Sequence, residues 1–472
     1  MKVLALLCLG ISLFDVVYSL PSLPFFNSEE GSKNEFLHSS PYSPEDLLEV
    51  RKSLNLSWTP DPDEFLSVPE LITKYGYPVE EHFTTTSDGY ILRMHRIPAT
   101  KPGVTPNNHV VFLMHGVLMS SSDWIILGPQ KALAYYLADQ GFDVWMGNAR
   151  GNTQSKNHTH LKPYQRKFWK FSWHEIATRD LPAMIDYTLK VTKKKALFHI
   201  GHSQGTTTFY VMCSELPKYN KKIIAHVSLA PIAYMKNAFS PLLRLVSKLL
   251  VVPKTLLNLF GIDEIMAHSS LMQMLGDNFC AVGERTEFLC RDFLFLVTGF
   301  DHAEFNDTML PVFLAHTPAG ASTRQLYHYA QLFNSGKFRQ YDYFPFNSLH
   351  YGPLHPINPP SYNLKKVKAP VYLFYSNNDW LSHPKDVKTL CKKLGNCKAQ
   401  TLVAENRFNH LDYVWGNNAK QRIYSEVKDE VLEQSMKEWN LKNSLLTDEF
   451  DDDEEEEVYE EDYDEDYSDD EE

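Results

Sequence analysis

Several ordinary features are scarce or missing in this chain of 472 residues, and each absence narrows what the chain can be. After the first 19 residues no segment reaches 18 uninterrupted apolar residues, so no transmembrane segment is expected. The six cysteines include no C-x-x-C pair, and no H-x-x-x-H ligand pattern occurs. Because zinc sites usually need such spacings, neither a metal site nor a cofactor is expected.

Charge is divided unevenly along the chain, which has a formal net charge of −13. Residues 448–472 hold 19 of the 59 acidic residues and no lysine or arginine. Residues 1–447 therefore carry 46 basic against 40 acidic residues, a mildly basic body near +6 beside a tail of −19. With 43% hydrophobic and 13% aromatic residues, the chain has ample material for a core, which excludes disorder throughout.

The acidic tail at 448–472 is expected to be a disordered, solvated terminus. Two functional alternatives remain open: contact with a basic partner, or folding back on the basic body. Tyr459, Tyr463 and Tyr467 lie in dense acid, a setting that favours tyrosine sulfation in a secreted protein. No nucleic-acid partner is expected.

Residues 1–19 have the pattern of a secretory signal peptide, with Lys2 ahead of an apolar stretch at 3–14 and small residues before the cut. A buried first helix is the alternative. We expect a secreted protein, with the lysosome as the alternative location.

Residues 20–67 are rich in Ser, Pro, Asn and Glu, which predicts a loose N-terminal extension. Glycosylation motifs of the N-x-S/T type stand at Asn55, Asn157 and Asn306.

Cysteine use fits an oxidising compartment. The pairs Cys280/Cys290 and Cys391/Cys397 are each close in sequence, which predicts two small disulfide loops. Cys213 is then left free and buried.

Strand and helix patterns alternate over residues 68–441. A hairpin is expected at 84–97, with Asp88-Gly89 at its turn. Alternation of this kind predicts an α/β fold whose mostly parallel sheet is covered on both faces. Buried strands are expected at 109–114, 142–146, 196–200, 223–229 and 371–375, and helices at 131–139 and 180–190.

One stretch, about 230–362, interrupts the alternation and reads as a helical cap inserted between two strands. Within it, residues 239–260 are strongly apolar with a few basic residues. Ordinary packing of the insertion is the favoured interpretation. A mobile lid that opens against a lipid surface is the alternative.

The motif Gly-His-Ser-Gln-Gly at 201–205 has the G-x-S-x-G form and directly follows the strand pattern at 196–200. A helix-compatible run at 206–214 comes next. Strand, serine and helix in this order are typical of a nucleophile elbow, a tight turn that exposes the serine above a sheet. We therefore expect Ser203 to be a nucleophile.

A serine hydroxyl needs a base and a carboxylate that orients the base, and on such folds the chain order is Ser, acid, His. Asp379 comes just after the strand pattern at 371–375, where functional residues collect in such sheets. Only His383 and His410 follow it. His383 is four residues away on the same loop and is poorly placed to reach Ser203, whereas His410 follows a strand-like run at 400–404. Asp379 and His410 are therefore the expected acid and base.

Acyl transfer also needs donors for the developing oxyanion. The backbone N–H of Gln204, next to the nucleophile, is one expected donor. The other is expected from the loop His-Gly-Val-Leu at 115–118, at the N–H of Val117.

The chain resembles the acid lipase family, which includes the gastric, lingual and lysosomal acid lipases. The resemblance covers about 68–435 and implies an α/β-hydrolase core with a helical cap and lid. It implies Ser203 as nucleophile, Asp379 as acid and His410 as base, and agrees with Val117 and Gln204 at the oxyanion hole. It also implies hydrolysis of water-insoluble esters, either triacylglycerols or steryl esters. The stretches that carry it are KYGYPVEEHFTTTSDGYILRMHRIP (74–98), HGVLMSSSDWI (115–125), WMGNARGNTQS (145–155), GHSQGTT (201–207), SNNDWLSHPKDV (376–387) and NHLDYVW (409–415).

The chain departs from the family in three places. A third cysteine that the family often has after the first pair is missing from residues 291–301. The Cys391/Cys397 pair and both terminal extensions lie outside the family pattern. Two alternatives to a lipase stay open: a hydrolase of small esters, and a catalytically silent lipid-binding or storage protein.

Overall fold

The computed structural model describes residues 61–241, 243, 244, 247, 263–265 and 287–448, all within one compact unit that spans Arg51–Glu472. Several expectations lie outside the described residues. These are the signal peptide, most of the extension with Asn55, residues 242, 245, 246 and 248–260 of the apolar segment at 239–260, Cys280, and the tail beyond Asp448 with its three tyrosines.

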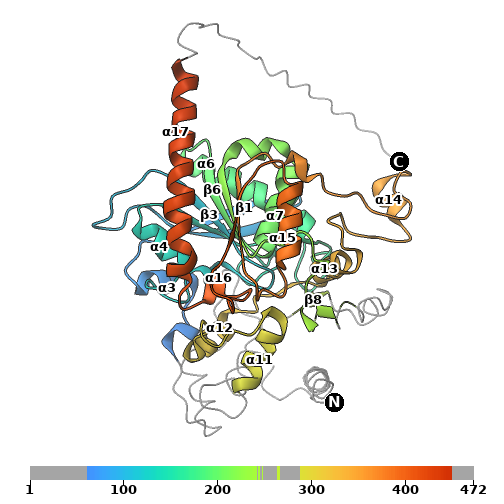
Figure 1. Cartoon of the computed structure of the whole chain (residues 1–472), viewed down its shortest axis with the longest axis horizontal. Coiled ribbons are helices and arrows are strands. Elements are labelled where there is room, and N and C mark those ends of the chain that lie inside the picture. The colour runs from blue at the N-terminus through green and yellow to red at the C-terminus, as the bar shows by residue number, and fades with distance from the viewer. Residues whose placement is uncertain (1–60, 242, 245–246, 248–262, 266–286, 449–472) are drawn as a thin grey trace. The chain divides into compact units, whose positions relative to one another are not determined.

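A mixed, mostly parallel sheet forms the centre, as the sequence predicts (Figure 1). The order of the strands is β1 (Glu80–Thr85), β2 (Tyr90–Ile97), β4 (Asp143–Gly147), β3 (Val110–Met114), β6 (Leu197–His202), β7 (Ile223–Leu229), β10 (Val371–Tyr375) and β11 (Cys397–Leu402), with β5 (Asn157–His158) beside β2. In this order, the six strands that begin with β4 and end with β11 are parallel to their neighbours. The pairs β1–β2, β2–β4 and β2–β5 are antiparallel.

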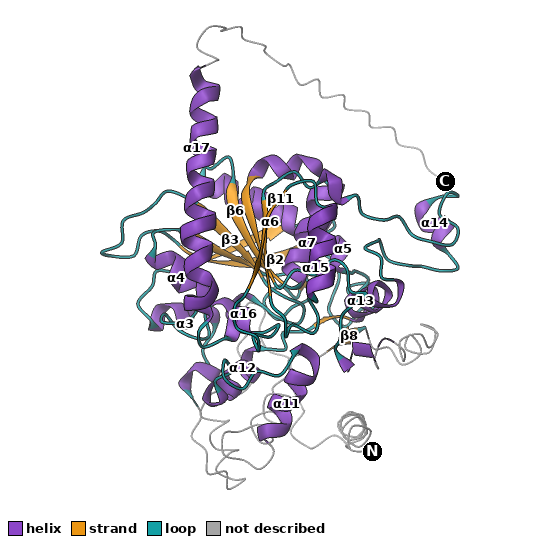
Figure 2. Cartoon of the chain, in the orientation of Figure 1, coloured by secondary structure: helices purple, strands orange, loops and turns teal. Residues whose placement is uncertain are grey.

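Both faces of the sheet are covered, which explains the continuous apolar strands. Every residue of β3 is buried. Val111 and Leu113 join the hydrophobic cluster on one face, and Val110 and Phe112 join the cluster on the other. Figure 2 shows helices on either side of the strands. One side holds α4 (Leu133–Asp139) and α17 (Glu433–Asp448), and the other α6 (Leu181–Thr192), α7 (Gln204–Glu215) and α15 (Pro384–Lys393).

The expected insertion lies between β7 and β10 and is mainly helical in its described part. A two-stranded antiparallel sheet, β8 with β9, accompanies the helices. Phe313 of the insertion stacks on Trp415 at 4.6 Å between ring centroids, which fixes the cap on the core. Its elements are β8 (Glu264–Ile265), α11 (Glu287–Thr298), α12 (Leu310–His316), β9 (Ala321–Ser322), α13 (Thr323–Ser335) and α14 (Asn347–Tyr351), and Trp415 ends α16 (Asp412–Trp415).

The described end of the N-terminal extension is packed against the domain rather than loose. A short 3-10 helix at Pro62–Glu64 precedes α3 (Val68–Lys74), and Asp63 and Glu64 are buried. The backbone oxygen of Asp63 accepts a hydrogen bond from Nε2 of His316 at 3.0 Å. Residues 61–67 therefore contact the cap.

One of the two predicted disulfide loops is confirmed. Cys391 and Cys397 form a disulfide, and Cys213 is free and buried on α7, as expected. The predicted bond between Cys280 and Cys290 is not confirmed and stays a prediction. Cys280 lies outside the described residues, and of Cys290, in the first turn of α11, only the backbone is described.

The sequence predicts no membrane-spanning segment after its first 19 residues. Among the described residues, no helix is both long and apolar enough to cross a membrane.

Candidate active site

Ser203 stands in the turn between β6 and α7 with backbone angles φ 51° and ψ −113°. Such angles are strained for a residue with a side chain and persist only where the surroundings hold them. The N–H of Ser203 donates to the Leu229 carbonyl at 3.0 Å, and the Thr206 hydroxyl donates to the Ser203 carbonyl at 2.6 Å. The turn is therefore held from the neighbouring strand and from its own helix.

Two glycines make this turn sterically possible. A Cβ at Gly205 would lie 2.1 Å from the Met114 carbonyl oxygen, far inside van der Waals contact. A Cβ at Gly201 would lie 2.7 Å from the backbone of Gly205. Both positions of the G-x-S-x-G motif are thus fixed by packing of α7 against β3 and β6.

Asp379 and His410 come from loops that follow neighbouring parallel strands, β10 and β11, so they meet Ser203 at the carboxyl edge of the sheet. Nε2 of His410 lies 2.8 Å from Oγ of Ser203. Nδ1 of His410 lies 2.8 Å from Oδ2 and 3.0 Å from Oδ1 of Asp379. The structure thus brings together the three residues that the sequence singles out.

In this chain of hydrogen bonds, the acceptors determine which atom carries each proton. A carboxylate can only accept, so Nδ1 of His410 carries the proton and Nε2 accepts from the Ser203 hydroxyl. Asp379 also accepts from the N–H groups of Leu381 at 2.9 Å and Ser382 at 2.7 Å. Exposed fractions of 7% for Ser203, 3% for His410 and 1% for Asp379 keep bulk water away. The arrangement can move a proton from serine to imidazole beside a fixed negative charge.

His115 orients the loop expected to supply the second oxyanion donor. Its Nδ1–H donates to the Gly116 carbonyl at 2.7 Å, and its Nε2 accepts from the N–H of Ala149 at 3.1 Å. Burial lowers the pKa of His115 to about 4, so it stays neutral and keeps both bonds. Because C=O and N–H of one peptide point in opposite directions, fixing the Gly116 carbonyl also fixes the N–H of Val117.

The loop with Val117 lies directly against the nucleophile. A Cβ at Gly116 would be 3.3 Å from Cβ of Ser203 and 3.1 Å from Nδ1 of His202. Gln204 begins α7 and is buried beside it. The loop of Val117 and the start of α7, which carry the two expected oxyanion donors, therefore meet at Ser203.

The cap contacts both loops that carry the acid and the base. The Thr298 carbonyl at the end of α11 accepts from the N–H of His410 and from that of Trp380, each at 3.3 Å. A Cβ at Gly299 would lie 2.1 Å from the Asn378 carbonyl oxygen. Neither contact has a sequence signal, because one uses a backbone oxygen and the other the lack of a side chain.

Other residues that the sequence singles out lie away from this site. His383 caps the N-terminus of α15, where it accepts from the N–H of Lys385. Of the expected glycosylation sites, Asn157 is exposed and Asn306 is half-buried. Across the described ranges, no three His, Cys, Asp or Glu side chains gather as a metal site.

Comparison with known proteins matches residues 68–128 to the "Partial alpha/beta-hydrolase lipase region" and residues 109–252 to the "alpha/beta hydrolase fold". Lipase 1 of Drosophila melanogaster is 42% identical over 389 residues, which cover 82% of each chain. Lipase 3 of Drosophila melanogaster is 46% identical over 360 residues, 76% of this chain and 91% of that one. Human gastric triacylglycerol lipase is 39% identical over 371 residues, 78% of this chain and 91% of that one.

A solved structure from Sulfolobus solfataricus shares the fold, with a TM-score of 0.50 and 15% identity over 73% of this chain and 90% of that one. Fold and family matches together place the chain among the α/β-hydrolases. It belongs to the acid lipase family within them, as the sequence motifs imply, and is a carboxylic ester hydrolase of the lipase type.

Proposed function

We propose that this protein is a secretory-pathway serine lipase that hydrolyses ester bonds of neutral lipids, namely triacylglycerols or steryl esters. Ser203 is the nucleophile, His410 the general base and Asp379 the acid that orients it. The observation that carries the proposal is the unbroken path of hydrogen bonds from Oγ of Ser203 through His410 to Asp379.

In the acylation step, His410 takes the proton of Ser203 while Oγ attacks the ester carbonyl carbon. Negative charge develops on the carbonyl oxygen, and the N–H groups of Val117 and Gln204 stabilise it as hydrogen-bond donors. Removing one such donor typically costs about 3–4 kcal/mol of transition-state stabilisation. Asp379 stabilises the imidazolium that forms on His410.

The intermediate then collapses and the C–O bond to the alcohol breaks. His410 gives its proton to the departing alkoxide, which leaves as a diacylglycerol or a sterol. A water molecule next loses a proton to His410 and attacks the acyl-enzyme, and the fatty acid leaves as the proton returns to Ser203. Each proton is thus moved by Nε2 of His410, the atom that faces Ser203.

Two observations support an insoluble substrate. A relative with 39% identity carries the name gastric triacylglycerol lipase, and the insertion between β7 and β10 contacts the loops with Asp379 and His410. A cap over the site suits a substrate that arrives from a lipid–water interface. Secretion is supported by the signal-like residues 1–19 and by the Cys391–Cys397 disulfide, since disulfides persist in oxidising compartments.

The test compares hydrolysis of emulsified triolein, emulsified cholesteryl oleate and a soluble short-chain ester, across pH 4 to 8. We expect turnover of at least one emulsion, and loss of all turnover in Ser203→Ala with the fold retained. Turnover of the soluble ester alone would overturn the lipid assignment. Activity retained in Ser203→Ala would overturn the mechanism.

A further inference from the structure

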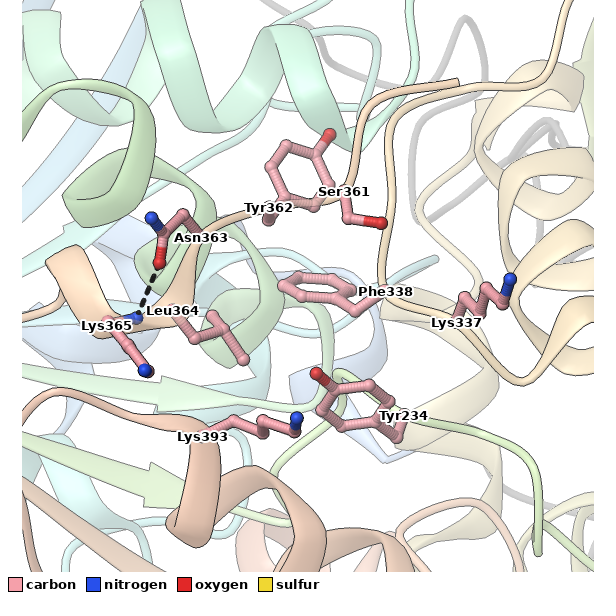
Figure 3. A pocket seen from close by; sticks show the side chains of 9 residues that line it. All are labelled: Tyr234, Lys337, Phe338, Ser361, Tyr362, Asn363, Leu364, Lys365 and Lys393. Carbon is pink, nitrogen blue, oxygen red and sulfur yellow. Dashed lines mark hydrogen bonds between the residues drawn. The ribbon is translucent and has the colours of Figure 1, made fainter. Parts of the chain in front are cut away.

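A cleft of about 370 Å³, whose lining does not include Ser203, Asp379 or His410, combines aromatic walls with a lysine rim (Figure 3). Phe338 stands between Tyr362, with ring centroids 4.8 Å apart, and Tyr234, with centroids 6.2 Å apart. Figure 3 shows Lys365 and Lys393 on one side of Phe338 and Lys337 on the other. The cleft therefore offers flat apolar surfaces inside a positively charged border.

The three rim lysines are exposed, and among the described residues none forms an ion pair with a carboxylate. Glu215, whose charge acts on Tyr362, accepts a hydrogen bond from Gln340 rather than from a lysine. Three ammonium groups that have no carboxylate partner among the described residues surround one cleft, and they attract an anionic ligand.

Two of the three rim lysines stand away from the candidate active site. Lys365 precedes β10 and Lys393 precedes β11, so both stand where these parallel strands begin. Asp379 and His410 follow the same two strands and stand where they end. These two lysines therefore stand at the other end of β10 and β11 from the candidate active site. Tyr234 follows the end of β7, and Lys337 and Phe338 follow α13 of the cap. None of the residues that line the cleft is Ser203, Asp379 or His410.

The C-terminal helix α17 runs toward the end of the sheet where Lys365 and Lys393 stand, on the opposite face of the sheet from Phe338 and Tyr362. Glu426 hydrogen-bonds Thr401 near the end of β11, whereas Ser435 Oγ lies 3.4 Å from the Tyr372 hydroxyl near the start of β10. The chain thus runs against the strands, and Figure 1 shows α17 continuing past the sheet. From Ser435 to the helix end at Asp448 the rise is about 20 Å.

Residues 449–472 follow α17, and an extended chain of that length reaches up to about 80 Å. This segment pairs dense Asp and Glu with tyrosines at 459, 463 and 467. The carboxylates can pair with the rim lysines, and the tyrosine rings can pack against the aromatic walls of Tyr234, Phe338 and Tyr362. Length and chemistry both allow the tail to occupy the cleft on its own molecule.

We propose that the acidic C-terminal segment 449–472 docks intramolecularly in the cleft bordered by Lys337, Lys365 and Lys393. The contact is mainly electrostatic at an exposed rim, so it weakens as salt shortens the Debye length from about 10 Å at 0.1 M to about 3 Å at 1 M. It requires no change in Ser203, Asp379 or His410, none of which lines the cleft.

The experiment uses the full chain and a glutamate-specific protease at low salt, with cleavage inside 449–472 followed by mass spectrometry. The test variant replaces Lys337, Lys365 and Lys393 by alanine. A matched control replaces Lys162, Lys167 and Lys190, which are also exposed and lack a carboxylate partner among the described residues. Carbodiimide cross-linking of the unmodified chain, done at high dilution, maps which lysines meet the tail carboxylates.

We expect tail cleavage to be severalfold faster in the test variant than in the unmodified chain, and unchanged in the control. Salt of about 0.5 M should raise cleavage of the unmodified chain relative to a site outside the tail. Cross-links should join the tail to the three rim lysines within one chain. Equal cleavage of all three proteins at low salt, cross-links spread over the control lysines, or links only between two chains would overturn the proposal.

Discussion

Nε2 of His202 lies 2.8 Å from the backbone carbonyl oxygen of His410, so the residue before the nucleophile holds the loop that carries the base. A carbonyl oxygen only accepts, which places the proton of His202 on Nε2. Burial, assisted by the nearby His410, lowers the pKa of His202 to about 3. His202 therefore stays neutral at pH values well above 3. The distance between His410 and Ser203 depends in part on the hydrogen bond from His202.

This contact predicts that His202→Leu lowers kcat while KM stays close to its original value. A displaced base costs roughly 10- to 100-fold, because proton transfer needs the heavy atoms within hydrogen-bond reach. His202→Gln restores a donor near the position of Nε2 and should recover part of the loss. Steady-state kinetics on a soluble ester measure both. Equal kcat values for the two variants would show that His202 matters only for packing.

Asp123 predicts a specific dependence of stability on pH. It accepts from the N–H of Ser120 at 2.8 Å and from the cap residue Thr317 at 3.0 Å, and burial raises its pKa to about 7 from an ordinary 3.8. Between these values the folded state binds more protons than the unfolded state, so this carboxyl lowers the free energy of unfolding as pH rises. Removing it should leave a chain that loses less stability between pH 4 and pH 7.

Urea unfolding of the unmodified chain and of Asp123→Asn at pH 4, 5.5 and 7 tests this. The free energy of unfolding of the variant, relative to the unmodified chain, should increase by about 3 kcal/mol between pH 4 and pH 7. Buried histidines such as His115 titrate in both proteins, so their contribution cancels in the difference. A difference that is constant across pH would contradict the account of Asp123.

Gly205→Ala should destabilise the fold and displace the nucleophile turn. The new Cβ would lie 2.1 Å from the Met114 carbonyl, and overpacking of this kind costs about 1–3 kcal/mol or more. Gly103→Ala is the control, since it has φ 81° but no atom within 4 Å of the new Cβ, and should cost about 1 kcal/mol from the backbone alone. Thermal unfolding should rank Gly205→Ala well below Gly103→Ala, and the reverse order would refute the packing argument.

The sequence predicts the sheet well because its central strands are buried on both faces. The expected strand at 109–114 is observed at Val110–Met114, and that at 371–375 is observed at those bounds. Edge strands are harder to predict from sequence. Residues 80–85 alternate between half-buried and exposed and lack an apolar run, so the expected hairpin at 84–97 misses most of β1, which begins at Glu80. The helix expected at 131–139 begins at Leu133, because the preceding residues form a turn with Ala132 bonded back to Gly128.

The three residues Ser203, Asp379 and His410 can be singled out from the sequence because their order and their positions after strands are constrained by the fold. The groups that hold these three residues and the oxyanion loop in place cannot be predicted from the sequence. Thr298 acts through its backbone oxygen, which any residue possesses. His115 and His202 are visible beside the expected oxyanion loop and nucleophile, but the bonds that give them a role join segments far apart in the chain.

The most direct test of the account is the reaction of the purified protein with a fluorophosphonate, followed by peptide mapping. Such probes label a serine only when a base activates it and an oxyanion hole receives the phosphonyl oxygen. We expect one label per chain, on Ser203, and its loss in His410→Ala. In Asp379→Asn, where His410 is left in the wrong tautomer, labelling should slow on the order of 10⁴-fold. Absence of label on Ser203 in the unmodified, folded chain, or labelling that persists in His410→Ala, would contradict it.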